Sequence, residues 1–134
     1  LKRRRSAAFT LVELVVVLTI IVVLAGSGIY LVTGIIDDAR VQTADNDLKA
    51  LDIAIKSYQR NNNGKPPSQE LGLNALVERP ADAKRWRQYL EEPMVDPWGN
   101  LYQYRFPAQK SKRRYDIWSL GEDGVESEDD IGNW

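Results

Sequence analysis

The sequence predicts an α+β fold, in which one long N-terminal helix packs on a small antiparallel sheet and an acidic loop closes the chain. Three observations predict it. An uncharged apolar run extends from Leu14 to Ile36, an amphipathic helical pattern continues it, and short alternating segments follow further along the chain. With 134 residues there is room for one modest domain and a membrane segment.

The first element is a candidate membrane helix with a basic head. Four basic residues, 2–5, precede the 23 uncharged residues from Leu14 to Ile36. About 20 helical residues cross a bilayer core, and basic residues stay on the cytoplasmic side. All residues after Ile36 are therefore expected on the side of the membrane opposite to the cytoplasm. Glu13 is an ionisable group near the end of this helix, which is costly unless it is paired and thus indicates a functional site.

Two other kinds of signal fit this segment less well. A removable secretory signal peptide would be cut near Ala25-Gly26-Ser27. A conventional signal has a shorter apolar region, and it has no reason to contain Glu13. A lipoprotein signal is excluded because Ser27 occupies the position where such a signal needs cysteine.

The second element continues the same helix. Six residues recur at spacings of three and four, which is typical of one buried stripe on an amphipathic helix. Asn61 to Gly64 then supply a stop signal. The helix is thus expected from about Thr10 to Arg60, a length of roughly 75 Å. The stripe residues are Val41, Ala44, Leu48, Leu51, Ile55 and Tyr58.

The remaining elements are short. Pro66-Pro67 predicts an extended linker, and Ser68 is a plausible N-cap for a helix through about Val77. Residues 96–100 are typical of a turn between the helix and two alternating strands, 101–106 and 115–119. Residues 107–114 form a polar, basic connection between these strands.

Composition excludes several functions. The chain has no Cys and no His, so it has no thiolate nucleophile, no histidine-based triad and none of the usual zinc or copper ligands. Removal of residues 1–8 would leave 14 basic against 19 acidic residues, a net charge of −5. Nothing basic follows Arg114, whereas seven acidic residues do. This asymmetry argues against nucleic acid and for a cation near the C-terminus.

The C-terminal loop is the candidate metal site. Six carboxylates lie between positions 122 and 130, and like charges so close together destabilise a compact loop unless a cation neutralises them. Carboxylate and carbonyl oxygens in a flexible loop suit Ca²⁺. A solvated acidic tail is the alternative on composition alone. Ile131 and Trp134 favour a loop that is pinned down at its end.

The N-terminal motif resembles that of a known group of proteins. Residues 9–14, Phe-Thr-Leu-Val-Glu-Leu, are similar to the class III signal of type IV pilins and type II secretion pseudopilins. The resemblance implies that a prepilin peptidase cuts between Ala8 and Phe9, that Phe9 is then N-methylated, and that Glu13 supports assembly. The family usually has Gly before the cut, and this chain has another small residue, Ala8.

The C-terminal half resembles the major pseudopilin family of type II secretion. The matching motifs are Ser119-Leu-Gly-Glu-Asp-Gly124, Asp130-Ile131, Asn133-Trp134 and Asp96-Pro-Trp-Gly99. The resemblance implies a pilin-like fold with a calcium-binding loop. The implied ligands are the carbonyls of Leu120 and Val125 and the carboxylates of Asp123, Asp129 and Asp130, with Glu128 as an alternative to Asp129.

The expected protein is a structural subunit and not an enzyme. It would comprise a cleaved leader (1–8), a transmembrane and assembly helix (9–36) and a periplasmic head (37–134), with the N-terminus cytoplasmic and the helix in the inner membrane. The resemblance implies a periplasmic homopolymer that drives export of folded proteins across the outer membrane. Its implied partners are minor pseudopilins, the prepilin peptidase and N-methyltransferase, and the inner-membrane secretion platform.

Two alternatives belong to other classes. A type IV pilin of a surface filament for adhesion or DNA uptake would be expected to show a Cys-bounded loop or a basic face. An enzyme or solute-binding domain on an uncleaved anchor would need a catalytic constellation, which the sequence does not contain.

Overall fold

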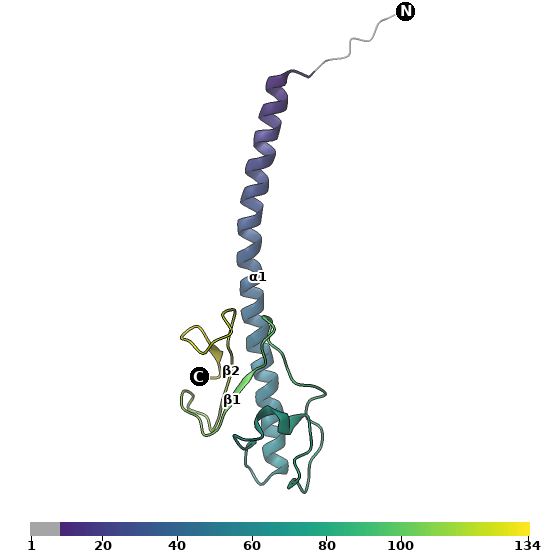
Figure 1. Ribbon diagram of the computed structural model, residues 1–134, viewed down its shortest axis with the longest axis vertical. Coiled ribbons are helices and arrows are strands. Elements are labelled where there is room, and N and C mark those ends of the chain that lie inside the picture. The colour runs from purple at the N-terminus through teal and green to yellow at the C-terminus, as the bar shows by residue number, and fades with distance from the viewer. Residues whose placement is uncertain (1–8) are drawn as a thin grey trace, which may run out of the picture. The chain divides into compact units, whose positions relative to one another are not determined.

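The computed structural model describes residues 9–134, with side chains except those of 28–33. The elements are the helix α1 (Leu11–Asn61), the 3-10 helix η1 (Gly72–Leu76) and the strands β1 (Gln103–Arg105), β2 (Asp116–Ser119) and β3 (Ile131–Gly132) (Figure 1). Internal contacts divide the chain into two units between Asp38 and Ala39. The second unit, Ala39–Trp134, contains the sheet and the core and is called the head below.

The predicted long helix is confirmed as α1. Five of the six predicted stripe residues are buried, from Ala44 to Tyr58, whereas Val41 is exposed. Burial starts one turn later than the pattern predicts, so the covered part of the helix is shorter. The predicted stop is also confirmed, because Asn63 and Gly64 both have positive φ and the Gly64 amide donates to the Gln59 carbonyl at 2.8 Å.

The prediction of a helix starting at Ser68 is wrong in its start and its type. The structure has the five-residue η1 instead, which begins at Gly72. Gly72 has φ +54°, a conformation that interrupts an α-helix. Ser68 accepts hydrogen bonds from the Gly72 amide at 2.9 Å through its carbonyl and from the Leu71 amide at 3.4 Å through its hydroxyl. It therefore caps a turn that precedes η1, and η1 has no side-chain cap of its own. Leu76 of η1 is fully buried, whereas Leu71, just before η1, is exposed.

The sheet is antiparallel with the order β1-β2-β3. Both predicted strands exist but are shorter than predicted. Tyr104 of β1 faces Ile117 of β2 in the register, and Ser119 of β2 faces Ile131 of β3. The strand β3 has no counterpart among the predicted elements. Two residues are too few to show a period, and the pairing with β2 defines the strand.

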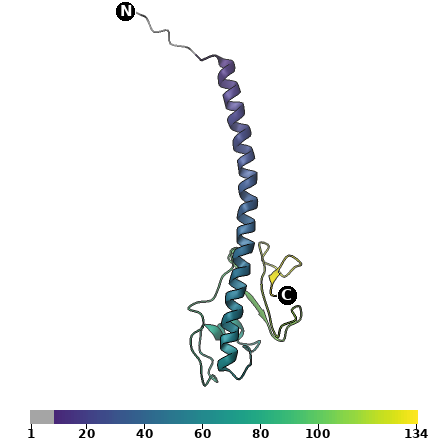
Figure 2. The same cartoon turned by 180° about the vertical axis from the view of Figure 1, so that it is seen from behind.

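The core lies where the sheet meets the second half of α1. Figures 1 and 2 show β1 and β2 beside this part of the helix from both sides. Two tyrosine hydroxyls tie the sheet segment to the helix: Tyr102 donates to Asp47 at 2.8 Å and Tyr115 to Asp52 at 2.7 Å. The buried cluster comprises Leu48, Leu51, Ala54, Ile55, Tyr58, Ala75, Leu76, Tyr102, Tyr115 and Ile117.

Candidate functional site

The N-terminal candidate site contains Phe9, Thr10 and Glu13; Ala8 lies outside the described residues. The Glu13 carboxylate accepts hydrogen bonds from the Thr10 amide at 3.0 Å and from the Thr10 hydroxyl at 2.9 Å. In return the Glu13 amide donates to the Thr10 hydroxyl oxygen at 3.2 Å. This reciprocal arrangement is a capping box, which satisfies free amides at the start of a helix. Glu13 thus helps to begin α1.

Sequence reasoning missed this role of Glu13. The signal was present, because Thr10-Leu-Val-Glu13 has the spacing of a capping box directly before an apolar run. The negative charge in the first turn also suits the positive end of the helix dipole. The resemblance implies that Glu13 supports assembly, and we predict that its charge then pairs with the methylated N-terminal amine of Phe9.

The apolar residues that follow are exposed along the described part of the first half of α1. Large side chains from Leu11 to Leu24, together with Ile35 and Ile36, are roughly half exposed or more. Over the residues whose side chains are described, none of the helices offers an apolar stretch sufficient to cross a membrane. The predicted membrane segment, 9–36, includes residues 28–33, whose side chains lie outside the described residues.

The acidic loop runs from Leu120 to Asp130 and is held at both ends by strands. β2 precedes it, β3 follows it, and the two strands pair with each other. The Asn133 amide adds a bond of 3.1 Å to the Ile117 carbonyl. The acidic loop therefore connects two strands that pair with each other. This agrees with the prediction, from Ile131 and Trp134, of a loop that is pinned down at its end.

A turn supports the beginning of the acidic loop from outside. Asp96 accepts hydrogen bonds from the amides of Trp98 at 3.1 Å and Asn100 at 2.8 Å, and also accepts one from the Ser119 hydroxyl. The Asn100 side chain then donates to the Gly121 carbonyl at 3.1 Å. The predicted turn at 96–100 is thus hydrogen bonded to the loop that starts after β2.

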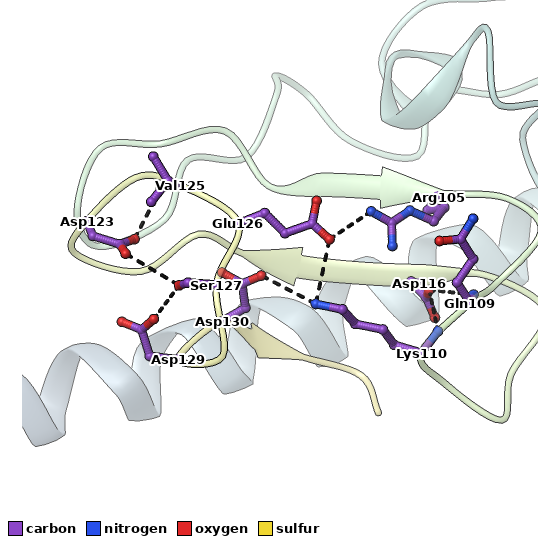
Figure 3. A network of polar contacts seen from close by, with 10 residues as sticks. All are labelled: Arg105, Gln109, Lys110, Asp116, Asp123, Val125, Glu126, Ser127, Asp129 and Asp130. Carbon is purple, nitrogen blue, oxygen red and sulfur yellow. Dashed lines mark hydrogen bonds and ion pairs between the residues drawn. The ribbon is translucent and has the colours of Figure 1, made fainter.

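The predicted ligands do not all meet. Asp123 accepts hydrogen bonds from the Val125 amide at 3.1 Å and from the Ser127 hydroxyl at 3.4 Å, and Ser127 also contacts Asp129 (Figure 3). The hydrogen bond from Ser127 lowers the pKa of Asp129. Over the part of the chain that the structure describes, no three acidic side chains gather closely enough to hold a metal ion. Two predicted carboxylates therefore lie together, joined through Ser127.

Asp130 lies apart from that pair and is the unusual member of the set. Its side chain is only 1% exposed, and neither carboxylate oxygen accepts a hydrogen bond from any described residue. The Lys110 ammonium is 3.7 Å from one of these oxygens. A buried carboxylate without hydrogen bonds is costly, so its surroundings favour a cation.

Two basic side chains reach this region from the neighbouring segments. Arg105 contacts Glu126 at 2.9 Å, and the Lys110 ammonium is 3.6 Å from the same carboxylate. Arg105 lies over the ring of Trp118 at 4.8 Å, and Lys110 over that of Trp134 at 4.7 Å. Sequence reasoning treated the acidic loop and the basic connection separately. No local pattern links the two segments, because these contacts join residues that are distant in the sequence.

The basic connection is itself organised around one buried carboxylate. Asp116 accepts hydrogen bonds from three successive backbone amides, those of Gln109 at 2.7 Å, Lys110 at 3.0 Å and Ser111 at 2.8 Å. Burial alone would raise the pKa of Asp116, but these three donors outweigh it and lower the pKa below its ordinary value. Asp116 thereby fixes the backbone from which the Lys110 side chain extends.

A further ion-pair network lies on the helix side of the sheet. Asp52 of α1 contacts Lys56 at 2.6 Å and Arg113 at 2.7 Å, in addition to the Tyr115 hydroxyl. Burial would raise the pKa of Asp52, but these hydrogen bonds and the nearby guanidinium lower it. The network joins the helix to the connection between β1 and β2. It explains why an acidic residue occurs on the covered side of α1.

Comparisons with known proteins cover the whole chain. Residues 31–134 match the family model described as type II secretion system (T2SS), protein G, and residues 3–29 match the prokaryotic N-terminal methylation motif. The chain is 40% identical over 143 residues to type II secretion system core protein G of Pseudomonas aeruginosa, which covers 100% of this chain and 99% of that protein. It is 41% identical over 137 residues to the protein of the same name from Klebsiella pneumoniae, with 98% and 96% covered.

A solved structure agrees with these relatives. The crystal structure of the major pseudopilin from the type 2 secretion system of enterohaemorrhagic Escherichia coli superposes with a TM-score of 0.68. The two sequences are 42% identical, and the match covers 76% of this chain and 92% of that one. The fold, the N-terminal motif and the full-length sequence similarity are therefore consistent with one another.

Proposed function

The chain belongs to the family of type II secretion system protein G, and we infer that it is the major pseudopilin, the structural subunit of the type II secretion pseudopilus. The observation that carries this conclusion is identity of about 40% to core G proteins over essentially the whole chain. The N-terminal methylation motif also supports this conclusion, because such a motif is typical of subunits that are processed before they assemble. The chain serves as a building unit and performs no catalysis of its own.

We propose that residues 9–36 anchor the subunit in the inner membrane before assembly and bundle with other copies in the filament. The exposed apolar side chains of the described part support this, since such a surface requires a bilayer or neighbouring helices to cover it. The head would then lie in the periplasm. Prepilin peptidase, minor pseudopilins and the inner-membrane platform are the partners that this route requires.

We also propose that the acidic loop binds Ca²⁺ through Leu120, Asp123, Val125, Asp129 and Asp130, with Glu128 as an alternative to Asp129. The buried carboxylate of Asp130, which accepts no hydrogen bond from a described residue, supports a cation there. Bound calcium would neutralise the carboxylates of the loop. The chain contributes the strands and the Asn100 hydrogen bond that hold the loop in place.

Deletion and complementation test the main conclusion. In the bacterium that carries this chain, deletion of its gene should leave secreted enzymes in the periplasm, and a plasmid copy should restore their release to the medium. A plasmid copy with Ser68→Ala, a change at an exposed turn, is the matched control and should also restore release. Normal secretion in the deletion strain, together with loss of a surface filament, would identify a type IV pilin instead.

A further inference from the structure

An open cavity with basic side chains lies at the end of α1. Its volume is about 680 Å³, and it is lined by the helix end and by the loops before and after η1. One acidic residue, Asp82, lines it together with four exposed basic residues, so the cavity carries a net positive charge. Among the ion pairs of the described residues, none involves any of these four. The basic residues are Arg60, Lys65, Lys84 and Arg85.

A structural role explains only one of these basic residues. Arg60 lies in the last turn of α1, where a positive charge suits the helix dipole, and its guanidinium donates to the Ser57 hydroxyl at 2.9 Å. Lys84 and Arg85 belong to a loop outside any helix. Like charges around one cavity repel one another, so the cavity favours an acidic occupant.

The acidic loop has the complementary features. Glu122 and Glu128 are exposed, and neither belongs to an ion pair of the described residues. Between them in the sequence, the apolar side chain of Val125 is 58% exposed. In the basic cavity, Leu71 is likewise an apolar residue that is 38% exposed. Apolar residues surrounded by a polar rim are typical of protein–protein contacts.

The two surfaces lie at opposite ends of the head, so they do not meet within one copy. Figures 1 and 2 show the acidic loop, in yellow, beside the part of α1 that enters the head, whereas the basic cavity lies at the end of α1. From Ala39 to Asn61 the helix extends over roughly 35 Å. A contact between two different surfaces of one chain is heterologous, and its repetition builds an open filament when the rotation does not close a ring.

We propose that the basic cavity of one subunit binds the acidic loop of a second copy, with Val125 packed against Leu71. The Glu122 and Glu128 carboxylates then lie among the basic side chains of the cavity. This inference rests on the homopolymer of the proposed function and names the contact between its heads. It does not require calcium, because neither Glu122 nor the side chain of Val125 is among the proposed ligands.

Charge reversal on each side tests the contact in the full-length chain, expressed from a plasmid in the deletion strain. Lys84→Glu/Arg85→Glu and Glu122→Lys/Glu128→Lys should each lower the number of filaments in electron micrographs about tenfold, because like charges then face each other. The variant with all four changes should restore the filaments, since it only exchanges the two signs. Lys112→Glu changes an exposed basic residue outside the cavity, so this matched control should assemble as the wild type does.

Cross-linking is a second measurement that does not depend on reversed charges. The chain has no cysteine, so introduced thiols are the only ones present. Filaments of Lys84→Cys/Glu122→Cys, treated with a short bismaleimide, should give a ladder of covalent multimers in a denaturing gel, whereas either single variant should give none.

Three results would overturn the contact: normal assembly of either reversed pair, failure of the fourfold variant to restore filaments, or assembled filaments without a cross-linked ladder. In each case normal secretion by the wild type would leave the proposed function standing. Absence of both filaments and secretion in the complemented strain would overturn the proposed function and this inference together.

Discussion

At the scale of single residues, the Glu13 carboxylate has to meet two separate requirements. Its hydrogen bonds to Thr10 close the capping box at the start of α1. Its negative charge is also what assembly is proposed to use, because a desolvated carboxylate next to an N-terminal amine would form an ion pair. The two roles differ in chemistry, since a cap needs an oxygen acceptor and an ion pair needs a charge.

This difference makes Glu13→Gln more informative than Glu13→Ala. Glutamine retains the acceptor that a capping box uses but has no charge. We expect both variants to insert into the membrane and both to form few filaments. Electron microscopy of filaments, with membrane fractionation as the control for insertion, measures this. Normal filaments from Glu13→Gln would show that capping is sufficient and that the charge is dispensable.

Asp116 gives a prediction for acid pH. Its folded pKa lies below the unfolded value of about 3.9, so its stabilisation is fully present above that value and is lost as the pH falls through the folded pKa. Asp116→Asn should lower the free energy of unfolding at pH 7 by about 1–3 kcal/mol, since an amide oxygen replaces a charged acceptor. As the pH falls from about 4 through the folded pKa of Asp116, the difference from the wild type should shrink. Denaturant unfolding at several pH values measures it, and a constant difference would contradict the assignment.

At the scale of elements, the acidic loop is expected to respond to cations, because six carboxylates lie between positions 122 and 130. Calcium should stabilise the chain by RT ln(1 + [L]/Kd), about 2.7 kcal/mol at a hundredfold excess over Kd. Melting in chelator and then in added Ca²⁺ measures this for the wild type and for Asp123→Ala/Asp130→Ala. Mg²⁺ should stabilise less, because it requires a tighter octahedral shell.

A control for this experiment lies in the same loop. Glu122→Gln removes an exposed carboxylate that is not among the proposed ligands, so it should retain the full response to Ca²⁺. If the double variant responds to Ca²⁺ as strongly as the wild type does, the loop is a solvated acidic segment without a specific site.

Some of the helices and strands could be predicted from the sequence and others could not. The helix α1 and the two longer strands were predictable because their patterns extend over several residues. The start of η1 was not, because a positive φ at Gly72 overrides the helical signal from Ser68. Nor was β3, which exists only through its pairing with β2. The same holds for Lys110 beside Asp130, since their contact depends on the folded register and not on sequence distance.

At the scale of the whole molecule, the order of processing and assembly should be visible in the mass of the mature chain. The match to the N-terminal methylation motif spans residues 3–29, which includes the expected cut between Ala8 and Phe9. Mass spectrometry of the protein from membranes should find N-methylated Phe9 at the N-terminus. A strain without the prepilin peptidase is the control and should retain residues 1–8. An N-terminus at Ser27 or Gly28 would instead indicate a conventional signal peptide.

The family and its N-terminal motif could be predicted from the sequence because both depend on contiguous residues. The environment of the acidic loop could not, since it is built from three separate segments: the turn at 96–100, the connection at 107–114 and the loop itself. From the composition of the loop alone, only repulsion among its acidic residues could be predicted. The fold adds the basic side chains Arg105 and Lys110, which offset part of that repulsion.

The hydrogen bonds to Asp116 also affect how readily a protease can cleave the subunit. Residues 110–114 contain four basic side chains, all exposed, in a segment that a trypsin-like enzyme would cut if it were free to extend. Three amides held by Asp116, and a bond of 3.0 Å from the Ala108 amide to the Arg114 carbonyl, keep the segment folded back on itself. A protease has to wait for this segment to open before it can bind it. The rate of tryptic cleavage at residues 110–114 therefore measures how often the hydrogen bonds to Asp116 break in an unassembled subunit.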